Sequence, residues 1–396
     1  MVSREQYMQK IRPFMNNDLI KVLTGIRRSG KSVMLELIRE ELKSTGVRDE
    51  QFIVLNFEDL NYAHLCDYLA LHQYICEKVN HSNQKMYLFL DEIQEVAHWE
   101  KCINSLRVEF DIDIYITGSN AKMLSGELAT YLAGRYVEFV IYPFSFSEFM
   151  LLKGETDRKS AFSDYIRFGG MPFLHNLNYD WEPSKQYLED LYHSVVLKDI
   201  VTRNKIRDID LLIKIISYII KNIGRTFSAT SISKYFKSDG RTVAPETILN
   251  YITACENAYL FYRANRKDLD GKKILSVNEK YYMADLGIRE AVFGSNTKDI
   301  ELVLENIVYM ELLRRGFRVT IGKAGDKEID FVAEKDGKVE YYQISYILAS
   351  EETKKREFGA LLDVRDNFPK YVLSTDMFDM SEQGIIHKNI TDWLTE

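Results

Sequence analysis

The chain has 396 residues, of which 46% are hydrophobic and 28% charged, and its formal net charge is -7. Together with the low content of six prolines, this composition excludes a largely disordered chain, and the length predicts about two or three domains. The negative charge argues against a protein that coats nucleic acid with its whole surface, although it is compatible with local basic patches.

The cysteines and the N-terminal residues show no pattern typical of secretion or membrane insertion. Cys66, Cys76, Cys102 and Cys255 form no C-x-x-C pair, which disfavours a disulfide framework and a zinc site. His72 and Cys76 share a helix face at spacing i, i+4, but a metal site would need two more ligands, so we interpret both as packing or surface residues. No segment has the roughly 18 to 20 apolar residues of a membrane span, and we expect a cytoplasmic protein without membrane contact.

The motif GIRRSGKS, residues 25–32, follows a short apolar strand expected at 20–25 and precedes a helix expected at 33–42. It fits the phosphate-loop pattern G-x-x-x-x-G-K-[ST] at each fixed position. Its glycines let the backbone turn so that N–H groups and a helix N-terminus face an anion. We predict that Lys31 reaches the β- and γ-phosphates and that Ser32 holds Mg²⁺. The predicted nucleotide-binding residues are Gly25, Ile26, Arg27, Arg28, Ser29, Gly30, Lys31, Ser32 and Val33.

An apolar run from residue 85 closes on two acids, Asp91 and Glu92. Such a run suits a strand buried on both faces of a parallel sheet, and ligands bind at the carboxyl ends of such strands. There Asp91 can hold the magnesium shell while Glu92 polarises the attacking water. Acids also end strands as solvated side chains, but after a phosphate loop the pair favours a hydrolase.

A further strand, expected within residues 111–120, ends in small polar residues that can hydrogen-bond the attacking water or the γ-phosphate. Asn120 is the first candidate for this sensor and Ser119 the second, and a cap for the helix that begins at Ala121 is the equally weighted alternative. Arg135 precedes the next strand, where its guanidinium can reach transition-state charge on a neighbouring subunit. A surface salt bridge is the equally weighted alternative for Arg135.

Four stretches together resemble the prokaryotic AAA-type P-loop ATPases that end in a conserved domain of unknown function: TGIRRSGKS, YLFLDEIQ, YITGSNAKMLSGELATYLAGRYVEFVIYPFSFSEF and YIRFGGMPF. The resemblance covers nearly the whole chain. It implies an ATPase core in which Lys31 binds the phosphates, Ser32 and Asp91 hold Mg²⁺, and Glu92 activates the attacking water. Ser119 or Asn120 would then sense the γ-phosphate, and Arg135 would be the arginine finger. It also implies a small helical lid that includes residues 146–174, with a tight GGMP turn near the nucleotide. No N-K-x-D motif is visible, which favours ATP over GTP.

Between about residues 208 and 285 the pattern changes to three helices followed by a hairpin, which predicts a winged helix-turn-helix. Pro245 is placed to open the third helix, and Ser228 or Thr230 to cap the second. Asp270 and Gly271 favour a tight hairpin turn. The third helix is the expected recognition element, exposing Thr247, Asn250 and Thr253. Basic hairpin residues can contact a DNA backbone, but many such modules only dock proteins or neighbouring domains, and the acidic chain as a whole weakens the DNA interpretation. The basic residues are Arg263, Arg266, Lys267, Lys272 and Lys273.

The last segment is expected to form a helix carrying Glu305, a strand, and a hairpin that turns at residues 336–337. Asp330 lies on the first hairpin strand, and Gln343 and Ser345 lie on the second. This order resembles the restriction-endonuclease-like fold, in which such acids and a [DE]-x-K pair hold a divalent metal. Glutamine can still ligate a metal, but serine cannot supply the positive charge of the lysine. We therefore expect a degenerate binding or scaffold domain with a remnant site at Glu305, Asp330 and Gln343.

These patterns predict four domains: a P-loop ATPase core with a parallel α/β sheet at 1–142, a helical lid at 143–207, a winged helix-turn-helix at 208–290 and an α+β restriction-endonuclease-like domain at 291–396. We expect magnesium-dependent ATP binding and hydrolysis that switches engagement of a protein or DNA partner. A non-hydrolysing ATP-dependent scaffold and an ATP-regulated DNA nuclease are the alternatives. A homo-oligomer is expected if Arg135 acts on a neighbouring subunit.

Overall fold

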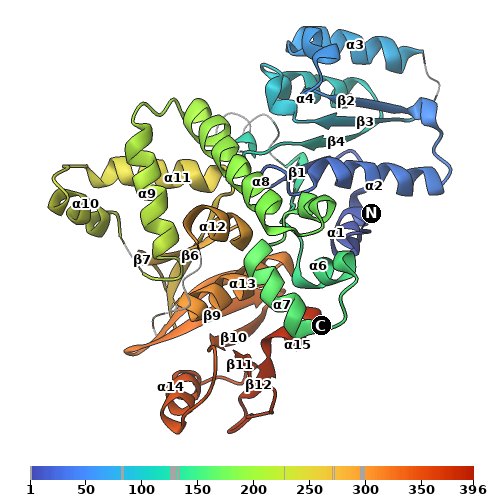
Figure 1. Cartoon of the computed structure of the whole chain (residues 1–396). Coiled ribbons are helices and arrows are strands. Elements are labelled where there is room, and N and C mark those ends of the chain that lie inside the picture. The colour runs from blue at the N-terminus through green and yellow to red at the C-terminus, as the bar shows by residue number, and fades with distance from the viewer. Residues whose placement is uncertain are drawn as a thin grey trace. The chain divides into compact units, whose positions relative to one another are not determined.

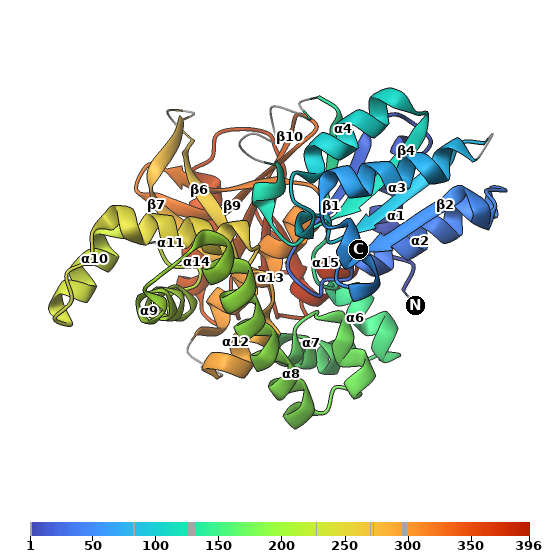
Figure 2. The same ribbon diagram turned by 90° about the horizontal axis from the view of Figure 1, so that it is seen from above.

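The computed structural model describes residues 2–81, 84–124, 132, 134–226, 228–269, 271, 273–294 and 299–396. The chain divides into two compact units, which Figures 1 and 2 show in two orientations. Unit 1 comprises residues 1–143 and 257–259, and unit 2 comprises residues 144–256 and 260–396. Among the helices described in these ranges, none combines the length and the apolar character that a bilayer crossing requires.

Unit 1 contains a five-stranded sheet in the order β2-β3-β4-β1-β5, in which all neighbouring strands run parallel. The strands are β1 (Ile20–Thr24), β2 (Phe52–Asn56), β3 (Met86–Asp91), β4 (Ile112–Thr117) and β5 (Tyr136–Val140). The register pairs Leu23 with Thr117 and Leu90 with Ile116. The carboxyl ends of the three central strands therefore meet at one edge of the sheet, where a parallel sheet binds ligands.

Four helices cover the two faces of this sheet: α1 (Glu5–Ile11), α2 (Lys31–Ser44), α3 (Tyr68–Asn80) and α4 (Trp99–Glu109). Helices α3 and α4 lie on one face and α1 and α2 on the other (Figure 1). Ile75 and Leu106 belong to the core on the first face, and Ile38 and Phe89 to the core on the second. Every residue of β1, β3 and β4 is buried, as expected for strands that are covered on both faces of the sheet. Two charged residues among them, Lys21 and Asp113, pair with each other.

Unit 2 begins with helices α6 (Phe146–Lys153), α7 (Arg158–Phe168) and α8 (Trp181–Ser194), the last extended by a π-helical segment, Val195–Thr202. Helix α12 (Leu286–Phe293) packs against α7 and α8, and the C-terminal helix α15 (Ile390–Thr395) packs against α6 and α7. Ser147 donates a hydrogen bond to the carbonyl of Leu394 at 2.9 Å. The boundaries that the sequence predicts at 207 and 290 therefore do not separate compact units, because late segments of the chain complete the packing of early ones.

The GGMP turn at residues 169–172 is fixed by Asp285, the residue that caps α12. The Asp285 carboxylate accepts hydrogen bonds from the backbone N–H of Gly170 at 2.6 Å and of Ile288 at 3.1 Å. A Cβ at Gly169 would lie 2.3 Å from this carboxylate, and one at Gly287 would lie 1.9 Å from the carbonyl of Phe168. The two glycines are needed because the backbones approach so closely.

The Asp285→Ala substitution is expected to destabilise unit 2 by about 1 to 3 kcal/mol, because it removes a helix cap and leaves the buried Gly170 N–H without an acceptor. Urea denaturation of the full chain measures this loss. The control is Asp157→Ala at the exposed cap of α7, which we expect to cost about 1 kcal/mol or less. Equal losses in the two variants would contradict the prediction.

The same carboxylate gives this prediction a pH dependence. Burial raises the pKa of Asp285 from 3.8 to about 6, although the amides of Gly170, Ile288 and Gly287 oppose the shift. Between these two values the unfolded chain loses the proton while the folded chain keeps it, so stability falls as pH rises. We expect the advantage of the wild-type chain over Asp285→Ala to shrink as pH rises from about 4 to about 6.

The next part of unit 2 contains three helices and a hairpin, as the sequence predicts. They are α9 (Ile209–Lys221), α10 (Ala229–Ser238), α11 (Pro245–Asn257), β6 (Phe261–Asp268) and β7 (Lys273–Met283). Pro245 is the first residue of α11, and Ser228 caps α10 by accepting a hydrogen bond from the N–H of Ser231 at 3.3 Å. Both predictions are confirmed. Asp270 and Lys272 of the expected turn lie outside the described residues.

The hairpin continues into a seven-stranded mixed sheet of order β12-β11-β10-β9-β8-β6-β7, because β6 pairs in parallel with β8. The remaining elements are α13 (Ile300–Arg314), β8 (Arg318–Ala324), β9 (Lys327–Lys335), β10 (Lys338–Ile344), α14 (Glu351–Leu362), β11 (Lys370–Ser374) and β12 (Ile386–Asn389). The β9–β10 turn has Asp336 and Gly337 at φ 51° and 76°, as the sequence predicts. The hairpin that the sequence assigns to a winged helix is thus one edge of the seven-stranded sheet.

Candidate functional site

The loop between β1 and α2 closes tightly and leaves a helix N-terminus open to a ligand. Gly25 has φ 135°, and a Cβ there would lie 2.3 Å from the carbonyl oxygen of Ile141. Gly30, at φ 98°, precedes α2, and no side chain caps this end of the helix. The first amides of α2 are therefore directed toward the loop, an arrangement that suits an anion.

Polar side chains of the loop match a phosphate and its cation. The Lys31 ammonium donates to the carbonyls of Gly25 and Ile26 at 3.2 Å each and lies 3.9 Å from the Glu92 carboxylate. The Ser29 hydroxyl is buried and has no hydrogen-bond partner within the described part of the chain. Ser32 is exposed at the start of α2. A buried hydroxyl without a partner next to uncapped amides fits a site that takes a phosphate group.

Asp91 and Glu92 lie at the end of β3, as the sequence predicts, and Thr117 of β4 connects them. The Thr117 hydroxyl donates to the Asp91 carboxylate and accepts from the Glu92 N–H at 2.9 Å. Burial raises the pKa of Asp91, while hydrogen bonds from Thr117 and Ser32 lower it. Ser32 thus acts on the Asp91 carboxylate, and these are the two oxygen ligands that the sequence assigns to Mg²⁺.

The Glu92 carboxylate is held in place by two neighbours. It accepts hydrogen bonds from the Gln94 amide and from the Ser119 hydroxyl, the latter at 3.4 Å. The backbone of Glu92 has φ 53°, a left-handed conformation that is uncommon for a glutamate. Such an outlier at the edge of the sheet fits a functional role for this side chain.

The two sensor candidates differ in what their side chains contact. Ser119 is buried and bonds Glu92, so it lies within the site. Asn120 is also buried, but its side-chain oxygen accepts from the N–H of Lys122 at 2.7 Å and so caps the following turn. Of the two candidates, Ser119 is therefore the one whose side chain contacts Glu92.

Arg135 lies at the opposite edge of the sheet from the phosphate loop. Its carbonyl accepts from the N–H of Ile20, and its guanidinium donates to the Asn104 side chain at 2.7 Å. The register pairs Ile20 with Tyr136 at the amino end of these strands, and five strand residues span about 16 Å. Arg135 therefore does not join the nucleotide site of its own chain.

Arg4 supports the loop, and the sequence analysis missed it. Its guanidinium donates to the carbonyl of Ser29 at 3.0 Å and to that of Tyr142 at 2.9 Å, and it is only 2% exposed. It also lies over the ring of Tyr7 at 4.6 Å. No sequence signal indicates this contact, because it joins residues far apart in the chain. Thr117, in contrast, is recognisable as a polar residue that ends an apolar strand.

Unit 2 brings together the three residues of the expected remnant site. Glu305 of α13, Asp330 of β9 and Gln343 of β10 line a pocket of ≈ 440 Å³. The Gln343 side-chain oxygen accepts from the N–H of Asp330 at 3.4 Å. The buried Lys280 of β7 donates to Glu305 at 3.2 Å and lies 3.0 Å from Glu328. The sequence analysis missed Lys280 because β7 was assigned to a different domain.

Lys280 brings a positive charge to this cluster, whereas Ser345 brings none. Ser345 is buried and donates weakly to the carbonyl of Ile347 at 3.4 Å. Burial of Lys280 favours the neutral amine, yet the carboxylates of Glu305, Asp330 and Glu328 raise its pKa. Burial, and then the charge of Glu305, raise the pKa of Asp330 well above its usual range. Lys280 is thus held as an ammonium ion, while burial opposes the ionisation of Asp330.

The Lys280→Met substitution is expected to destabilise unit 2 by about 3 to 5 kcal/mol, because it leaves buried carboxylates without their cation. Denaturant titration of the full chain measures the loss. Lys335→Met, at an exposed strand end, is the matched control and is expected to change stability by about 0.5 kcal/mol or less. A Lys280 variant as stable as this control would show that the ammonium is dispensable.

Comparison with known proteins agrees with this geometry. Residues 17–150 match the model of a family described as an AAA domain, and residues 159–299 match a domain of unknown function, DUF8612. An uncharacterized protein of Haemophilus influenzae is 40% identical over 402 residues, which cover 100% of this chain and 99% of that protein. The chain belongs to this family of AAA-domain proteins.

Two further similarities fit this family. The uncharacterized protein MJ1544 of Methanocaldococcus jannaschii is 31% identical over 360 residues, covering 86% of this chain and 77% of that protein. A Walker-type ATPase of Pyrococcus abyssi has a similar fold, with a TM-score of 0.51 and 14% identity over 73% of this chain and 95% of that one. The AAA domain model covers the residues of the P-loop sheet, while the DUF8612 model crosses the boundary expected at 207.

Proposed function

We propose that this AAA-domain protein binds and hydrolyses ATP with the help of Mg²⁺. The observation that carries the proposal is the convergence of the phosphate loop and the two acids at one edge of the sheet, with the Lys31 ammonium 3.9 Å from the Glu92 carboxylate. A cation and a base at this spacing fit a site that binds a phosphate and activates water beside it.

The residues of the site divide the chemistry between them. Loop amides and Lys31 bind the phosphate oxygens, and Ser32 and Asp91 offer oxygen ligands to Mg²⁺. When bound, Mg²⁺ neutralises negative charge on the phosphates. Glu92 orients the attacking water and accepts its proton, while the hydrogen bond from Ser119 at 3.4 Å helps to hold the Glu92 carboxylate.

Phosphate release by the purified full chain tests the proposal. We expect release from ATP that requires Mg²⁺ and stops when EDTA is added, with less release from GTP. The alternative function is a non-hydrolysing scaffold that changes state when ATP binds. Calorimetric binding of ATP without any phosphate release would favour that scaffold and would contradict the proposed hydrolysis.

The nucleotide state is proposed to control engagement of a partner, and the charges of the β6–β7 hairpin favour a protein over DNA. Arg263 lies 3.0 Å from Glu256, Arg266 lies 2.9 Å from Glu328, and Lys267 pairs with Glu334. These acids already neutralise basic groups that a DNA backbone would need. We expect the chain to show no salt-dependent affinity for DNA, either with or without ATP. If the wild type did bind DNA and the Lys267→Ala variant did not, DNA would be favoured as the partner.

Arg135 is proposed to act on the nucleotide of a neighbouring subunit, since it lies far from the loop of its own chain. We expect Arg135→Ala and Lys31→Ala to be inactive separately and to recover phosphate release when mixed, because each variant supplies the group that the other lacks. The assay is phosphate release as a function of mixing ratio. An Arg135→Ala variant that is fully active alone would leave Arg135 as a surface residue bonded to Asn104.

A second candidate function is metal-dependent hydrolysis of DNA at Glu305, Asp330 and Gln343. Lys280 favours it, because its ammonium bonds Glu305 at 3.2 Å and can stabilise negative charge on a phosphate. Incubation of plasmid DNA with Mg²⁺ or Mn²⁺ tests the activity, and Asp330→Ala is expected to abolish it. Intact plasmid under all of these conditions would establish the cluster as a binding or structural feature.

A further inference from the structure

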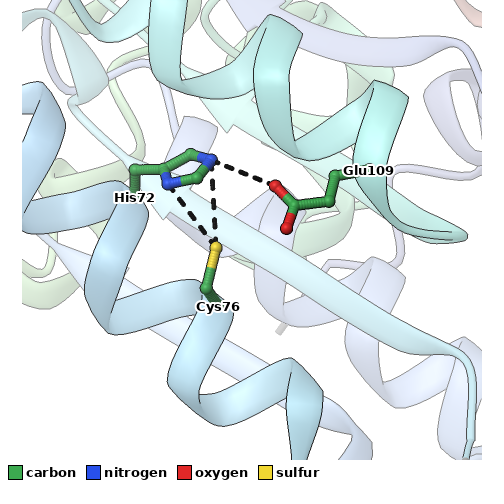
Figure 3. Close-up of side chains that lie close together, drawn as sticks. All are labelled: His72, Cys76 and Glu109. Carbon is green, nitrogen blue, oxygen red and sulfur yellow. Dashed lines mark hydrogen bonds and ion pairs between the residues drawn. The ribbon is translucent and has the colours of Figure 1, made fainter.

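A histidine, a cysteine and a glutamate meet between α3 and α4, on the outer side of the helix layer of unit 1 (Figure 3). His72 and Cys76 are one turn apart on α3, and Glu109 is the last residue of α4. The sequence analysis found the first two but no further ligand. The fold supplies Glu109, which lies 33 positions beyond Cys76 in the chain.

The packing of the two helices explains this meeting. Leu71 and Ile75 of α3 are fully buried in the core beneath the helices, and so is Leu106 of α4. Each metal-binding side chain lies one or three positions from such a buried residue and is therefore turned toward the neighbouring helix. The cluster is partly open to solvent, since the side chains of His72 and Glu109 are 27% and 50% exposed. A metal ion can reach it without unfolding the helices.

The separations of the three ligand atoms suit a tetrahedral ion. The His72 Nε2 atom lies 3.5 Å from Glu109 Oε2 and 3.8 Å from Cys76 Sγ, and the three ligand atoms all lie within 4.8 Å of one another. Ligands held tetrahedrally at zinc distances of about 2.0 to 2.3 Å are about 3.4 to 3.6 Å apart. The N···O separation exceeds the roughly 2.7 to 3.2 Å of a good hydrogen bond. The Cys76 sulfur also lies 3.5 Å from His72 Nδ1, within the range of a hydrogen bond to sulfur. The separations of the cluster thus match hydrogen bonds and an ion pair in the absence of a metal, and they also fall near the spacing of zinc ligands.

The charges favour a divalent ion of intermediate softness. The Cys76 sulfur and the Glu109 carboxylate lie close together and repel each other when both are ionised. A divalent cation would balance these two anionic ligands, and a thiolate and an imidazole select zinc over magnesium or calcium. His72 Nε2 also lies 3.0 Å from the Ser105 hydroxyl. That contact supports the competing interpretation, a histidine that is simply hydrogen-bonded at the surface.

We propose that His72, Cys76 and Glu109 form a zinc site that joins α3 to α4. Three protein ligands leave a fourth position for water or for the Ser105 hydroxyl. The site is distinct from the nucleotide site, because Glu109 lies before β4, at the edge of the sheet opposite to the phosphate loop. A bound ion would fix the two helices that cover one face of the sheet, and it needs no ATP to do so.

Zinc titration of the full chain without nucleotide tests the proposal by calorimetry. We expect one Zn²⁺ per chain, and affinities about tenfold or more weaker in each of the variants His72→Gln, Cys76→Ser and Glu109→Gln. The matched controls are His81→Gln at the end of the same helix and Cys66→Ser, and both are expected to bind like the wild type. Circular dichroism verifies that each variant is folded. Zinc binding that is absent from the wild type, or that persists unchanged in the three variants, overturns the proposal.

Cobalt provides a second measurement that reports the ligands directly. With Co²⁺ the wild-type chain should show a thiolate-to-metal absorption band and the visible bands of a tetrahedral ion. The thiolate band should disappear in Cys76→Ser and remain in Cys66→Ser. Zinc should also slow alkylation of Cys76 and leave that of Cys66 unchanged. A thiolate band that survives in Cys76→Ser would place the metal elsewhere and refute the assignment.

Discussion

Replacing Lys31 by alanine is expected to lower magnesium-dependent phosphate release by a factor of about 100 to 1,000. The Lys31 ammonium lies at the centre of the loop, 3.2 Å from two of its carbonyls and 3.9 Å from Glu92. Without it, the loop amides must balance the phosphate charge alone, both in the bound nucleotide and in the transition state. Calorimetric titration with ATP measures the loss of affinity for the bound nucleotide, and steady-state phosphate release measures the loss of rate.

The matched control is Lys43→Ala near the end of the same helix. Lys43 is partly exposed and pairs with Glu40 and Asp49, far along α2 from the loop. Its removal tests the effect of losing one positive charge from α2 without touching the site, and we expect phosphate release to stay within about twofold of the wild type. Equal rates of phosphate release by the wild type and by Lys31→Ala would show that this loop is not a site of ATP hydrolysis.

Replacing Glu92 by glutamine is expected to slow hydrolysis by a factor of about 100 to 10,000 while ATP affinity is retained. Glutamine keeps the length of the side chain and one oxygen for the bonds from Gln94 and Ser119, but it cannot accept a proton from water. The expected result is a reduced kcat with little change in the calorimetric Kd. Single-turnover measurements with excess protein report the chemical step itself.

Glu95→Gln is the control, because Glu95 lies in the same turn but is exposed. It should hydrolyse ATP at the wild-type rate. If Glu92→Gln bound and hydrolysed ATP like the wild type, Glu92 would not be the base. If both the wild type and Glu92→Gln bound ATP but neither released phosphate, the scaffold function would be favoured instead.

The sequence predicted the positions of those residues of the candidate site that depend on short spacings. Gly25, Gly30 and Lys31 lie on one loop, and Asp91 and Glu92 end one strand, so local patterns were sufficient to find them. The start of the helix at Pro245, the cap at Ser228 and the β9–β10 turn at Asp336 and Gly337 were predicted from local residues in the same way. These features are local, and so neighbouring residues determine them.

The features that the sequence left open or did not indicate depend on pairings between distant segments. Arg135 precedes a strand as expected, but the register of β5 beside β1 decides which edge of the sheet it occupies. Lys280 lies on β7 and bonds Glu305 through the packing of α13 on that sheet. Glu109 reaches His72 because α4 packs beside α3. No spacing along the chain encodes such contacts, since they arise from tertiary packing.

The packing of α15 on α6 has a consequence for the order in which the chain folds during synthesis. Unit 1 has all of its strands once Val140 has been made, and it lacks only residues 257–259. Unit 2 starts with α6 but needs Leu394 to close against it. Helices that emerge early from the ribosome must therefore wait for almost the whole chain, with apolar surfaces uncovered in the meantime. We expect the nascent chain to be most prone to aggregation during this interval.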